Sequence, residues 1–324
     1  MRLGILFLLA VTCASAAQTP SVSLLVLNKE EGSVAIVDPA SNAVVGRVQV
    51  GEGPHEIVAS SDGKLAFAGN YGGRTPGSTI SVIDLVAQKE MRRVDLGSLR
   101  RPHGLAFAGG KLYFTAEVNK LIGRYDPASN NIDWLLGTGQ NTTHMLLLSK
   151  DLSQIYTANI GSDSISIIDS VNNGAGWNET VVPVGKGPEG NDLSPDGKEL
   201  WAADSRDGGV SVIDIASKKV VRTLSLGTKR SNRLKFTPDG KRVLITDLEA
   251  DELLVLDAPS GNVIKRIQLG RNPEGILIAP NGARAFVGVA GENKVVIVDL
   301  HALEVTGNIA TGAGPDGMAW AVRK

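Results

Sequence analysis

The sequence predicts an all-β protein, a seven-bladed β-propeller with four antiparallel strands in each blade. Three observations lead to this prediction: a motif that recurs seven times, short strands within each repeat, and two chain ends that together complete one repeat. The chain has 324 residues, of which 42% are hydrophobic and 4% aromatic, and it contains 38 glycines. This composition favours a large apolar core interrupted by many turns.

The repeat is marked by an apolar residue followed by an aspartate. The seven aspartates are Asp38, Asp84, Asp126, Asp169, Asp214, Asp257 and Asp299. They lie 42 to 46 residues apart, a period typical of propellers when each unit consists of short strands. An aspartate at the end of a strand accepts backbone hydrogen bonds in the next turn. Seven copies at one position therefore indicate a scaffold role and not a catalytic one.

Within one repeat, short apolar segments alternate with turn residues. Residues 190–194, 199–203, 209–214 and 219–226 are predicted to be its four strands, and Pro195-Asp196-Gly197 forms its first turn. Similar turns occur at residues 61–63, 238–240 and 280–282. Proline presets φ in such turns, and glycine or asparagine accepts a positive φ. Each repeat is thus predicted to be a four-stranded meander, and helices are expected to be few.

The two ends of the chain are predicted to close the ring. Residues 24–28, 34–38 and 43–50 supply the second, third and fourth strands of a repeat that lacks its first strand. Residues 316–322 match a first strand with nothing after it. Pairing the last strand with the first three completes a seventh blade and removes the sheet edges that an open array would expose.

These repeats resemble the YVTN-type β-propeller repeat proteins of bacteria and archaea. The resemblance lies in the Gly-x-x-Pro start, the Pro-Asp-Gly turn, the Val-Ile-Asp third strand, and second strands that end in Ala158-Asn159 or Ala203-Asp204. It covers residues 24–322, although the second strands at 65–68 and 285–288 depart from the motif. The resemblance implies the fold. It leaves the function open, because such propellers include binding proteins, surface proteins and lactonase-like enzymes.

Residues 1–16 are predicted to be a cleaved signal peptide, which leaves residues 17–324 as a single propeller domain. Arg2 precedes an apolar run at 3–11, and Ala14-Ser15-Ala16 suits cleavage. The run is about half of the roughly 20 residues that a membrane-spanning helix needs. Lipidation of Cys13 is the weaker alternative, because Thr12 fits poorly before a lipidated cysteine. We expect a periplasmic or extracellular protein with no membrane span.

The composition also bounds the partners and cofactors. Formal net charge is -1, with 33 basic and 34 acidic residues, so no global field attracts nucleic acid or anionic lipid. Glycine fingerprints at 185–190 and 312–317 recur with the repeat and lead into strands, so no nucleotide cofactor is expected. Cys13 is the only cysteine, and the mature chain therefore has neither disulfides nor thiolate ligands. We expect a monomer.

One position in the repeat carries the residues with the clearest chemistry. It follows the Gly-x-x-Pro start, and we call its seven occupants the ring residues: His55, His103, His144, Glu189, Asn232, Glu274 and Asp316. Because first strands surround the propeller axis, these side chains are predicted to meet at one rim. Imidazole and carboxylate bind zinc, copper, iron or manganese where thiolate is lacking. The predicted ligands of one divalent ion are His55, His103 and His144, with Glu189, Glu274 or Asp316.

A second set of polar residues is predicted at the same rim, where the second strands end. With the ring residue Asn232 and its neighbour Arg233, the predicted ligand-binding residues are Asn70, Glu117, Asn159, Asp204, Asp247, Asn232 and Arg233. Arg233 stands where four other repeats have glycine. Its guanidinium can bind a carboxylate of a ligand, or pair with Glu189 or Glu274. The alternative for the whole rim is a structural hydrogen-bond network around a water-filled funnel.

Three functions remain open from the sequence. The first is an exported propeller that binds a small ligand, a metal ion or a partner at the histidine-bearing rim. The second is a metal-dependent, lactonase-like hydrolase that uses the same rim. The third is a structural module that recognises protein or glycan. A loop at residues 71–78 is predicted beside His55, either as a lid or as a surface insertion, and His301 is predicted to be exposed at the opposite end of a blade.

Overall fold

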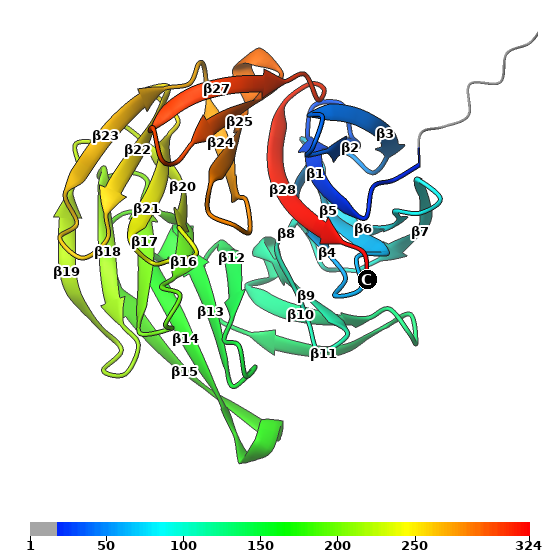
Figure 1. The fold of residues 1–324 in the computed structure, drawn as a ribbon. Coiled ribbons are helices and arrows are strands. Elements are labelled where there is room, and N and C mark those ends of the chain that lie inside the picture. Colours follow the sequence, from blue (N-terminus) through cyan, green and yellow to red (C-terminus); the bar gives the residue numbers. More distant parts are fainter. Residues whose placement is uncertain (1–17) are drawn as a thin grey trace, which may run out of the picture.

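A computed structural model describes residues 18–324 as a ring of seven four-stranded antiparallel sheets (Figure 1). The predicted seven-bladed propeller is confirmed. The predicted signal peptide at residues 1–16 lies outside the described residues. No helix between residues 18 and 324 is both long enough and apolar enough to cross a membrane.

The strands follow one another in the order expected of a meander. The sheet that closes the ring contains β28 (Pro315–Val322), β1 (Val22–Asn28), β2 (Ser33–Asp38) and β3 (Ala43–Gln49). The next three sheets contain β4 (Pro54–Ala59), β5 (Leu65–Gly72), β6 (Pro76–Asp84) and β7 (Lys89–Asp95); β8 (Pro102–Ala108), β9 (Lys111–Ala116), β10 (Leu121–Asp126) and β11 (Asn131–Gly137); β12 (Thr143–Leu148), β13 (Gln154–Asn159), β14 (Ser164–Val171) and β15 (Gly176–Pro183).

The remaining sheets repeat the same plan. They contain β16 (Pro188–Leu193), β17 (Glu199–Asp204), β18 (Gly209–Asp214) and β19 (Lys219–Ser225); β20 (Ser231–Phe236), β21 (Arg242–Asp247), β22 (Glu252–Asp257) and β23 (Val263–Gln268); β24 (Pro273–Ile278), β25 (Arg284–Val289), β26 (Lys294–Asp299) and β27 (Glu304–Ile309). Four single-turn 3₁₀ helices are described: η1 (Glu117–Asn119), η2 (Ile160–Ser162), η3 (Asn172–Gly174) and η4 (Ala290–Glu292).

The carboxyl-terminal strand closes the ring. β28 pairs antiparallel with β1, so that Leu24 faces Trp320 and Leu25 faces Ala319. Figure 1 shows the two ends of the chain side by side, β28 in red against β1 in blue. Hydrogen bonds between these strands replace two sheet edges that would otherwise be exposed. The predicted closure of the ring, by pairing of the last strand with the first, is therefore confirmed.

The core lies between neighbouring blades. Second and third strands are buried on both faces, as in β2, where only the last residue is partly exposed. Aromatic side chains wedge the blades together. Trp201 packs edge-on against Phe236 of the next blade with ring centroids 5.3 Å apart, and Phe286 packs against Trp320 at 5.5 Å. Such burial of apolar side chains is the main stabilising contribution to the fold.

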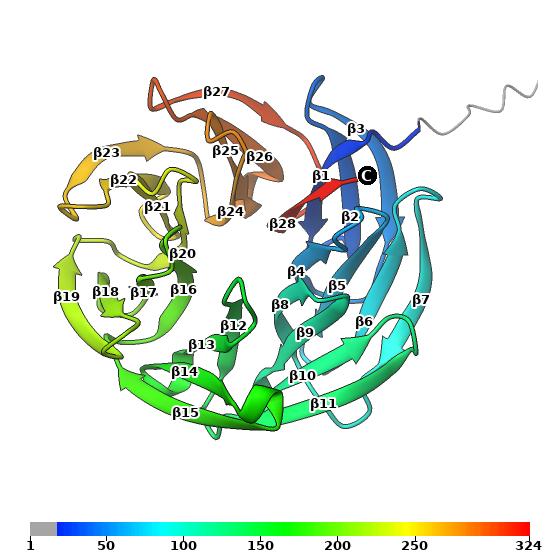
Figure 2. The same cartoon turned by 60° about the horizontal axis from the view of Figure 1, so that its bottom comes forward.

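The innermost strands approach one another closely around the axis of the ring (Figure 2). A Cβ atom added to Gly104 in β8 would lie 2.5 Å from the carbonyl oxygen of His144 in β12. One added to Gly317 in β28 would lie 2.3 Å from the carbonyl oxygen of His55 in β4. Glycine one residue after a ring residue thus allows adjacent inner strands to touch. This contact sets neighbouring ring residues side by side.

One segment differs from the sequence prediction. Residues 71–78, predicted to be a loop, mostly continue the strands β5 and β6, and Gly72 pairs with Pro76 across a short turn. The ladder persists because the segment's glycines and its one proline, Pro76, lie near the tip, where the hairpin bends and few ladder hydrogen bonds are needed. Tyr71 is consequently held on a strand at the rim and not on an open loop.

Candidate functional site

All seven ring residues line a single cavity on the propeller axis. The cavity has a volume of about 240 Å³, and Arg233 lines it as well. Lys29 and Tyr71 reach it from the ends of β1 and β5. The rim that the sequence predicts thus exists as a compact polar cavity. Its size suits a metal ion together with part of a small molecule.

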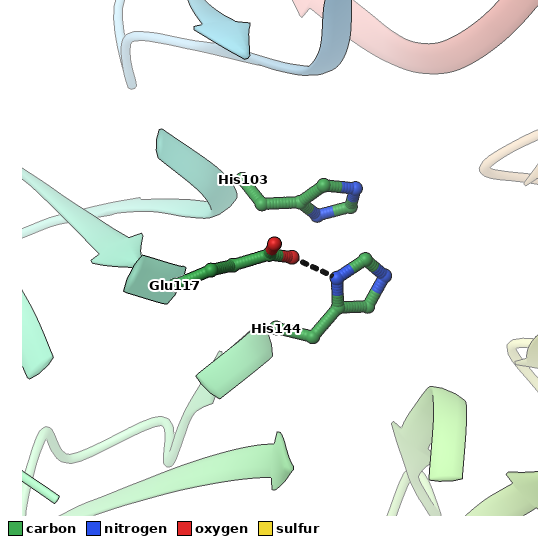
Figure 3. A group of neighbouring side chains, drawn as sticks. All are labelled: His103, Glu117 and His144. Carbon is green, nitrogen blue, oxygen red and sulfur yellow. Dashed lines mark hydrogen bonds and ion pairs between the residues drawn. The ribbon is translucent and has the colours of Figure 1, made fainter. Parts of the chain in front are cut away.

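Three buried side chains on one wall form a group with the spacing of metal ligands. They are His103, Glu117 and His144, which are 2%, 5% and 7% exposed. The atoms that each can offer to an ion lie within 4.8 Å of one another. The imidazole rings of His103 and His144 are 3.7 Å apart, and Nδ1 of His144 pairs with the Glu117 carboxylate (Figure 3). We call these three residues the His-Glu-His group.

Two imidazole nitrogens of this group are buried without a partner. Nδ1 of His103 and Nε2 of His144 make no hydrogen bond within the described chain. Leaving a buried polar atom unpaired costs about 1–3 kcal/mol. Burial, followed by the neighbouring imidazoles of His144 and His55, holds the pKa of His103 well below its usual range. His103 is therefore neutral, which is the form that binds a metal.

Tyr71 and Arg101 hold the carboxylate of Glu117 from behind. The Tyr71 hydroxyl donates to Oε2 of Glu117 at 2.7 Å, and Nη1 of Arg101 donates to the Tyr71 oxygen at 2.8 Å. The Arg101 guanidinium also lies 4.6 Å from the centre of the Tyr71 ring. Burial and the Glu117 charge raise the pKa of Tyr71 to about 12. The phenol therefore stays protonated and keeps donating, which orients the carboxylate.

His55 lies beside the His-Glu-His group but has a different polar partner. Its ring centroid is 5.3 Å from that of His103 and 4.7 Å from that of Tyr71. Its Nδ1 lies 3.3 Å from Oδ2 of Asp316. Because Nδ1 faces a carboxylate, Nε2 is the nitrogen left for other contacts.

Opposite charges face each other inside the cavity. Arg233, 6% exposed, donates to Oε1 of Glu56 at 2.7 Å and lies 3.8 Å from Oδ1 of Asp316. Lys29 pairs with Glu274 and lies 3.7 Å from Oδ2 of Asp316. Arg233 thus pairs with carboxylates other than the predicted Glu189 and Glu274. Removing one member of such a buried pair is strongly destabilising, because a lone buried charge remains.

Two carboxyl groups of this network have opposite pKa shifts. Burial, then the charge of Asp316, raises the pKa of Glu274 to about 7. Burial alone would raise the pKa of Asp316 as well, but the hydrogen bond with His55 and the charges of Lys29 and Arg233 hold it well below its usual range. Asp316 is therefore ionised at all ordinary pH values, whereas Glu274 titrates near neutrality.

Four predicted residues lie behind the cavity wall. Asn70 accepts from the Gly51 amide, Asn159 donates to Ser166, and Asp204 accepts from Ser211. Asp247 accepts from the amides of Lys229 and Arg230. All four side chains are buried and do not line the cavity. Their bonds hold the strands and inter-blade linkers that support the rim.

Two residues of the charge network, Lys29 and Glu56, were not singled out by sequence reasoning, whereas Tyr71 belongs to the segment 71–78 that was predicted beside His55. Glu56 follows its ring residue, at the position where Arg233 also stands and where glycine prevails. The opposite charges of Glu56 and Arg233 at one repeat position could have predicted that the two side chains form an ion pair. Lys29 follows the last residue of β1, and nothing in its local sequence shows that it reaches inward.

Comparison with known families identifies the chain. Residues 6–181 match the model of the YNCE-like beta-propeller family. The protein belongs to this family. The match confirms the predicted resemblance to repeat propellers, and no curated protein matches the chain.

Solved structures share the fold of this YNCE-like propeller at low sequence identity. Hydrazine synthase of Kuenenia stuttgartiensis is 23% identical with a TM-score of 0.70, and the match covers 82% of this chain and 89% of that one. The periplasmic gluconolactonase of Pseudomonas aeruginosa is 16% identical with a TM-score of 0.75, covering 94% and 99%. A putative 6-phosphogluconolactonase of Bacteroides uniformis is 15% identical with a TM-score of 0.77, covering 92% and 99%.

Larger hollows of the YNCE-like propeller lie at the other ends of the blades. One of about 660 Å³ lies between the turns that contain Asp196 and Asp239, and one of about 560 Å³ lies between those that contain Asp239 and Asn281. The second borders the exposed residue His301. Since these hollows recur from blade to blade, they follow from the spacing of turns. Of these three spaces, the axial cavity is the one that His103 and His144 line.

Proposed function

We propose that this protein binds one divalent transition-metal ion through His103, His144 and Glu117 and presents it to a small ligand in the axial cavity. The observation that carries the proposal is the pair of buried, unpartnered imidazole nitrogens beside a buried carboxylate. A bound ion would satisfy one of these nitrogens and neutralise the Glu117 charge. The donor set suits zinc, copper, iron or manganese.

The position of the group supports ligand binding on the metal. Three protein ligands leave at least one coordination position open in a metal site. The cavity that His103 and His144 line is also lined by His55, Asp316, Lys29 and Arg233. A ligand that carries an oxygen donor can therefore reach the ion and meet charged side chains at the same time.

A zinc titration tests this proposal. Chelator-treated protein is titrated with Zn²⁺ by calorimetry, and the bound metal is counted by elemental analysis. We expect one ion for each chain, and we expect His103→Ala to weaken binding by at least about 100-fold, because one of three protein ligands is lost. His301→Ala is the matched control, since His301 is exposed at the other ends of the blades. Equal affinity in both variants would refute the assignment.

A second candidate function is hydrolysis of a lactone. It is favoured by the His55 and Asp316 pair next to the metal group and by Glu274, whose pKa is raised to about 7 in the same cavity. Water would add to the lactone carbonyl as His55 takes its proton, the ring C–O bond would break, and Glu274 would protonate the departing oxygen, giving a hydroxy acid. A divalent ion polarises such a carbonyl.

The hydrolase candidate is tested with glucono-δ-lactone in a pH-stat assay of the zinc-loaded protein. We expect His55→Gln to lower kcat by about 100-fold or more, the usual contribution of a general base, while zinc stoichiometry stays at one. The rate should fall as the pH rises through about 7, because Glu274 then loses the proton that it donates. Hydrolysis no faster than in buffer would exclude this function for that substrate.

The proposed location is the periplasm or the cell exterior, and the proposed form is a monomer. The location is supported by the signal peptide predicted at residues 1–16. A periplasmic neighbour among the solved structures is compatible with it. Recognition of a protein or glycan at the rim stays a third prediction.

A further inference from the structure

A second pocket opens beside the axial cavity on the same rim. Its volume is about 410 Å³, and it shares Glu189 and Arg230 with the axial cavity. Arg206, Lys229 and Glu249 line the rest of it together with small or apolar side chains. We call it the rim pocket. The two spaces are therefore adjacent along Glu189 and Arg230.

Three cationic side chains of the rim pocket have no ion-pair partner. Arg206, Lys229 and Arg230 form no salt bridge within residues 18–324, whereas Lys186 on the same rim pairs with Asp163 at 2.8 Å. The three side chains are exposed, whereas the cations of the axial cavity, Lys29 and Arg233, are paired with carboxylates. The rim pocket thus keeps positive charge available for an anion that comes from outside.

The main chain beneath these cations is anchored. The amides of Lys229 and Arg230 donate to the carboxylate of Asp247 at 2.7 and 2.9 Å. The amide of Arg206 donates to the carbonyl of Lys186 at 3.0 Å. The backbone that carries the three cations is therefore fixed in position, and only the side chains must order when an anion binds. Such preorganisation lowers the entropic cost of binding.

Carboxylates at the pocket indicate what accompanies the anionic group. Glu189, at the junction of the two spaces, takes the Asn232 amide on Oε1 at 2.6 Å, which leaves Oε2 to accept another hydrogen bond. Glu249 lines the rim pocket as well. Carboxylate oxygens accept from hydroxyl groups and repel additional negative charge. They therefore favour a ligand with one terminal anionic group and hydroxyls along its chain.

We propose that the rim pocket binds the terminal phosphate of a small hydroxylated organic acid whose other end enters the axial cavity. This inference rests on the proposed function, since the second end reaches the metal group. Arg206 and Arg230 hold the anion by charge-assisted hydrogen bonds, and Lys229 adds charge. Glu189 accepts a hydroxyl of the connecting chain.

Two probes that differ by one group test the proposal. Gluconate and 6-phosphogluconate share a carboxylate and a polyol chain, and only the second carries a terminal phosphate. Calorimetric titration of the zinc-loaded full chain should give a Kd for 6-phosphogluconate at least tenfold lower than that for gluconate. In the double variant Arg206→Ser, Arg230→Ser this advantage should disappear, while the Kd for gluconate should stay within about twofold of the wild-type value.

Arg271→Ser provides the matched control. Arg271 lies two residues before β24, as Lys229 lies two residues before β20, but it lines neither cavity, and its side chain donates to the Gly291 carbonyl. The control should keep the tenfold preference. Equal Kd values for the two probes on the wild-type protein, no binding of either probe, or equal effects of the double variant and the control would each overturn the rim pocket.

A metal-free arm separates this proposal from the proposed function. With His103→Ala protein in EDTA, 6-phosphogluconate should still bind weakly, and the arginine double variant should weaken that binding further. If zinc fails to bind the wild-type chain but this arginine dependence persists, the metal assignment fails and the rim pocket stands. If zinc binds with one ion per chain and the phosphate has no effect, the reverse holds.

Discussion

Four second strands end in a buried side chain that hydrogen-bonds a serine of the adjacent third strand. In three of them the residue is asparagine: Asn28 donates to Ser33, Asn70 to Ser81 and Asn159 to Ser166. In the fourth, Asp204 accepts from Ser211, and its Oδ1 has no partner. Burial raises the pKa of Asp204 to about 7. An ionisable group thus stands where the fold needs only a neutral amide.

We predict that Asp204→Asn stabilises the protein above pH 7. The pKa of Asp204 is higher in the folded chain than its ordinary value of 3.8, so the folded state binds more protons between about pH 4 and 7. Stability from this group is therefore present at low pH and is lost as the pH rises through that window, by about 2 to 4 kcal/mol. Urea unfolding between pH 4 and 8 should show a smaller pH dependence in the variant.

Asp247→Asn is the control for that measurement. Both carboxylate oxygens of Asp247 accept backbone amides, and asparagine can replace only one of these oxygens as an acceptor. The control should lose about 1–3 kcal/mol at all pH values. Parallel stability curves for wild type and Asp204→Asn would show that Asp204 does not titrate in this range.

At the scale of single residues, the sequence predicted which residues line the cavity better than it predicted which of them contact one another. The seven ring residues share one repeat position, and the repeat alone brings them together. The predicted grouping of three histidines with a ring carboxylate could not include Glu117 as a ligand beside His103, because that contact depends on the reach of a side chain from another strand. Tyr71 and Arg101 support Glu117 through contacts that repeat spacing does not encode.

Contacts between the inner strands set the positions of the side chains that line the cavity. Gly104 lets β8 touch β12, and a Cβ atom there would lie 2.5 Å from the His144 carbonyl oxygen. A side chain at this position must push the strands apart, and these strands hold His103 and His144. The geometry of the His-Glu-His group therefore depends on a residue that offers no ligand atom.

We predict that Gly104→Ala lowers both stability and metal affinity. Overpacking of this kind costs about 1–3 kcal/mol, and the displaced imidazoles should weaken zinc binding by at least about tenfold. Thermal unfolding and zinc calorimetry measure the two effects. Gly137→Ala serves as the control, because an added Cβ there meets no atom within 4 Å. Unchanged zinc affinity in Gly104→Ala would mean that the group does not depend on this strand contact.

Element prediction succeeded where the repeat set the pattern and failed where one blade departs from it. The strand order and the ring closure follow from seven similar units. Residues 71–78 occur in one repeat only, and their glycines and proline indicated a loop. The structure continues the ladder of β5 and β6 there, because pairing of the flanking strands outweighs weak local propensity.

At the scale of the whole molecule, seven similar blades surround one axis, and the ring residues, which differ from blade to blade, line the cavity on that axis. Histidines come from three consecutive blades and carboxylates or an amide from the other four. The net charge of -1 does not reveal that positive and negative side chains are clustered in different places. Lys29 and Arg233 offset the ring carboxylates inside, while Arg206, Lys229 and Arg230 leave unpaired positive charge outside. Such polarity is what a metal site with an anionic ligand requires.

The most direct test of this account is anomalous diffraction at the zinc absorption edge from crystals of the chelator-treated chain soaked with one equivalent of Zn²⁺. The account predicts one dominant anomalous peak, bounded by His103, Glu117 and His144 and facing the axial cavity. A crystal with full zinc exposure and no peak among these three residues, or with a peak only at His301, would contradict it.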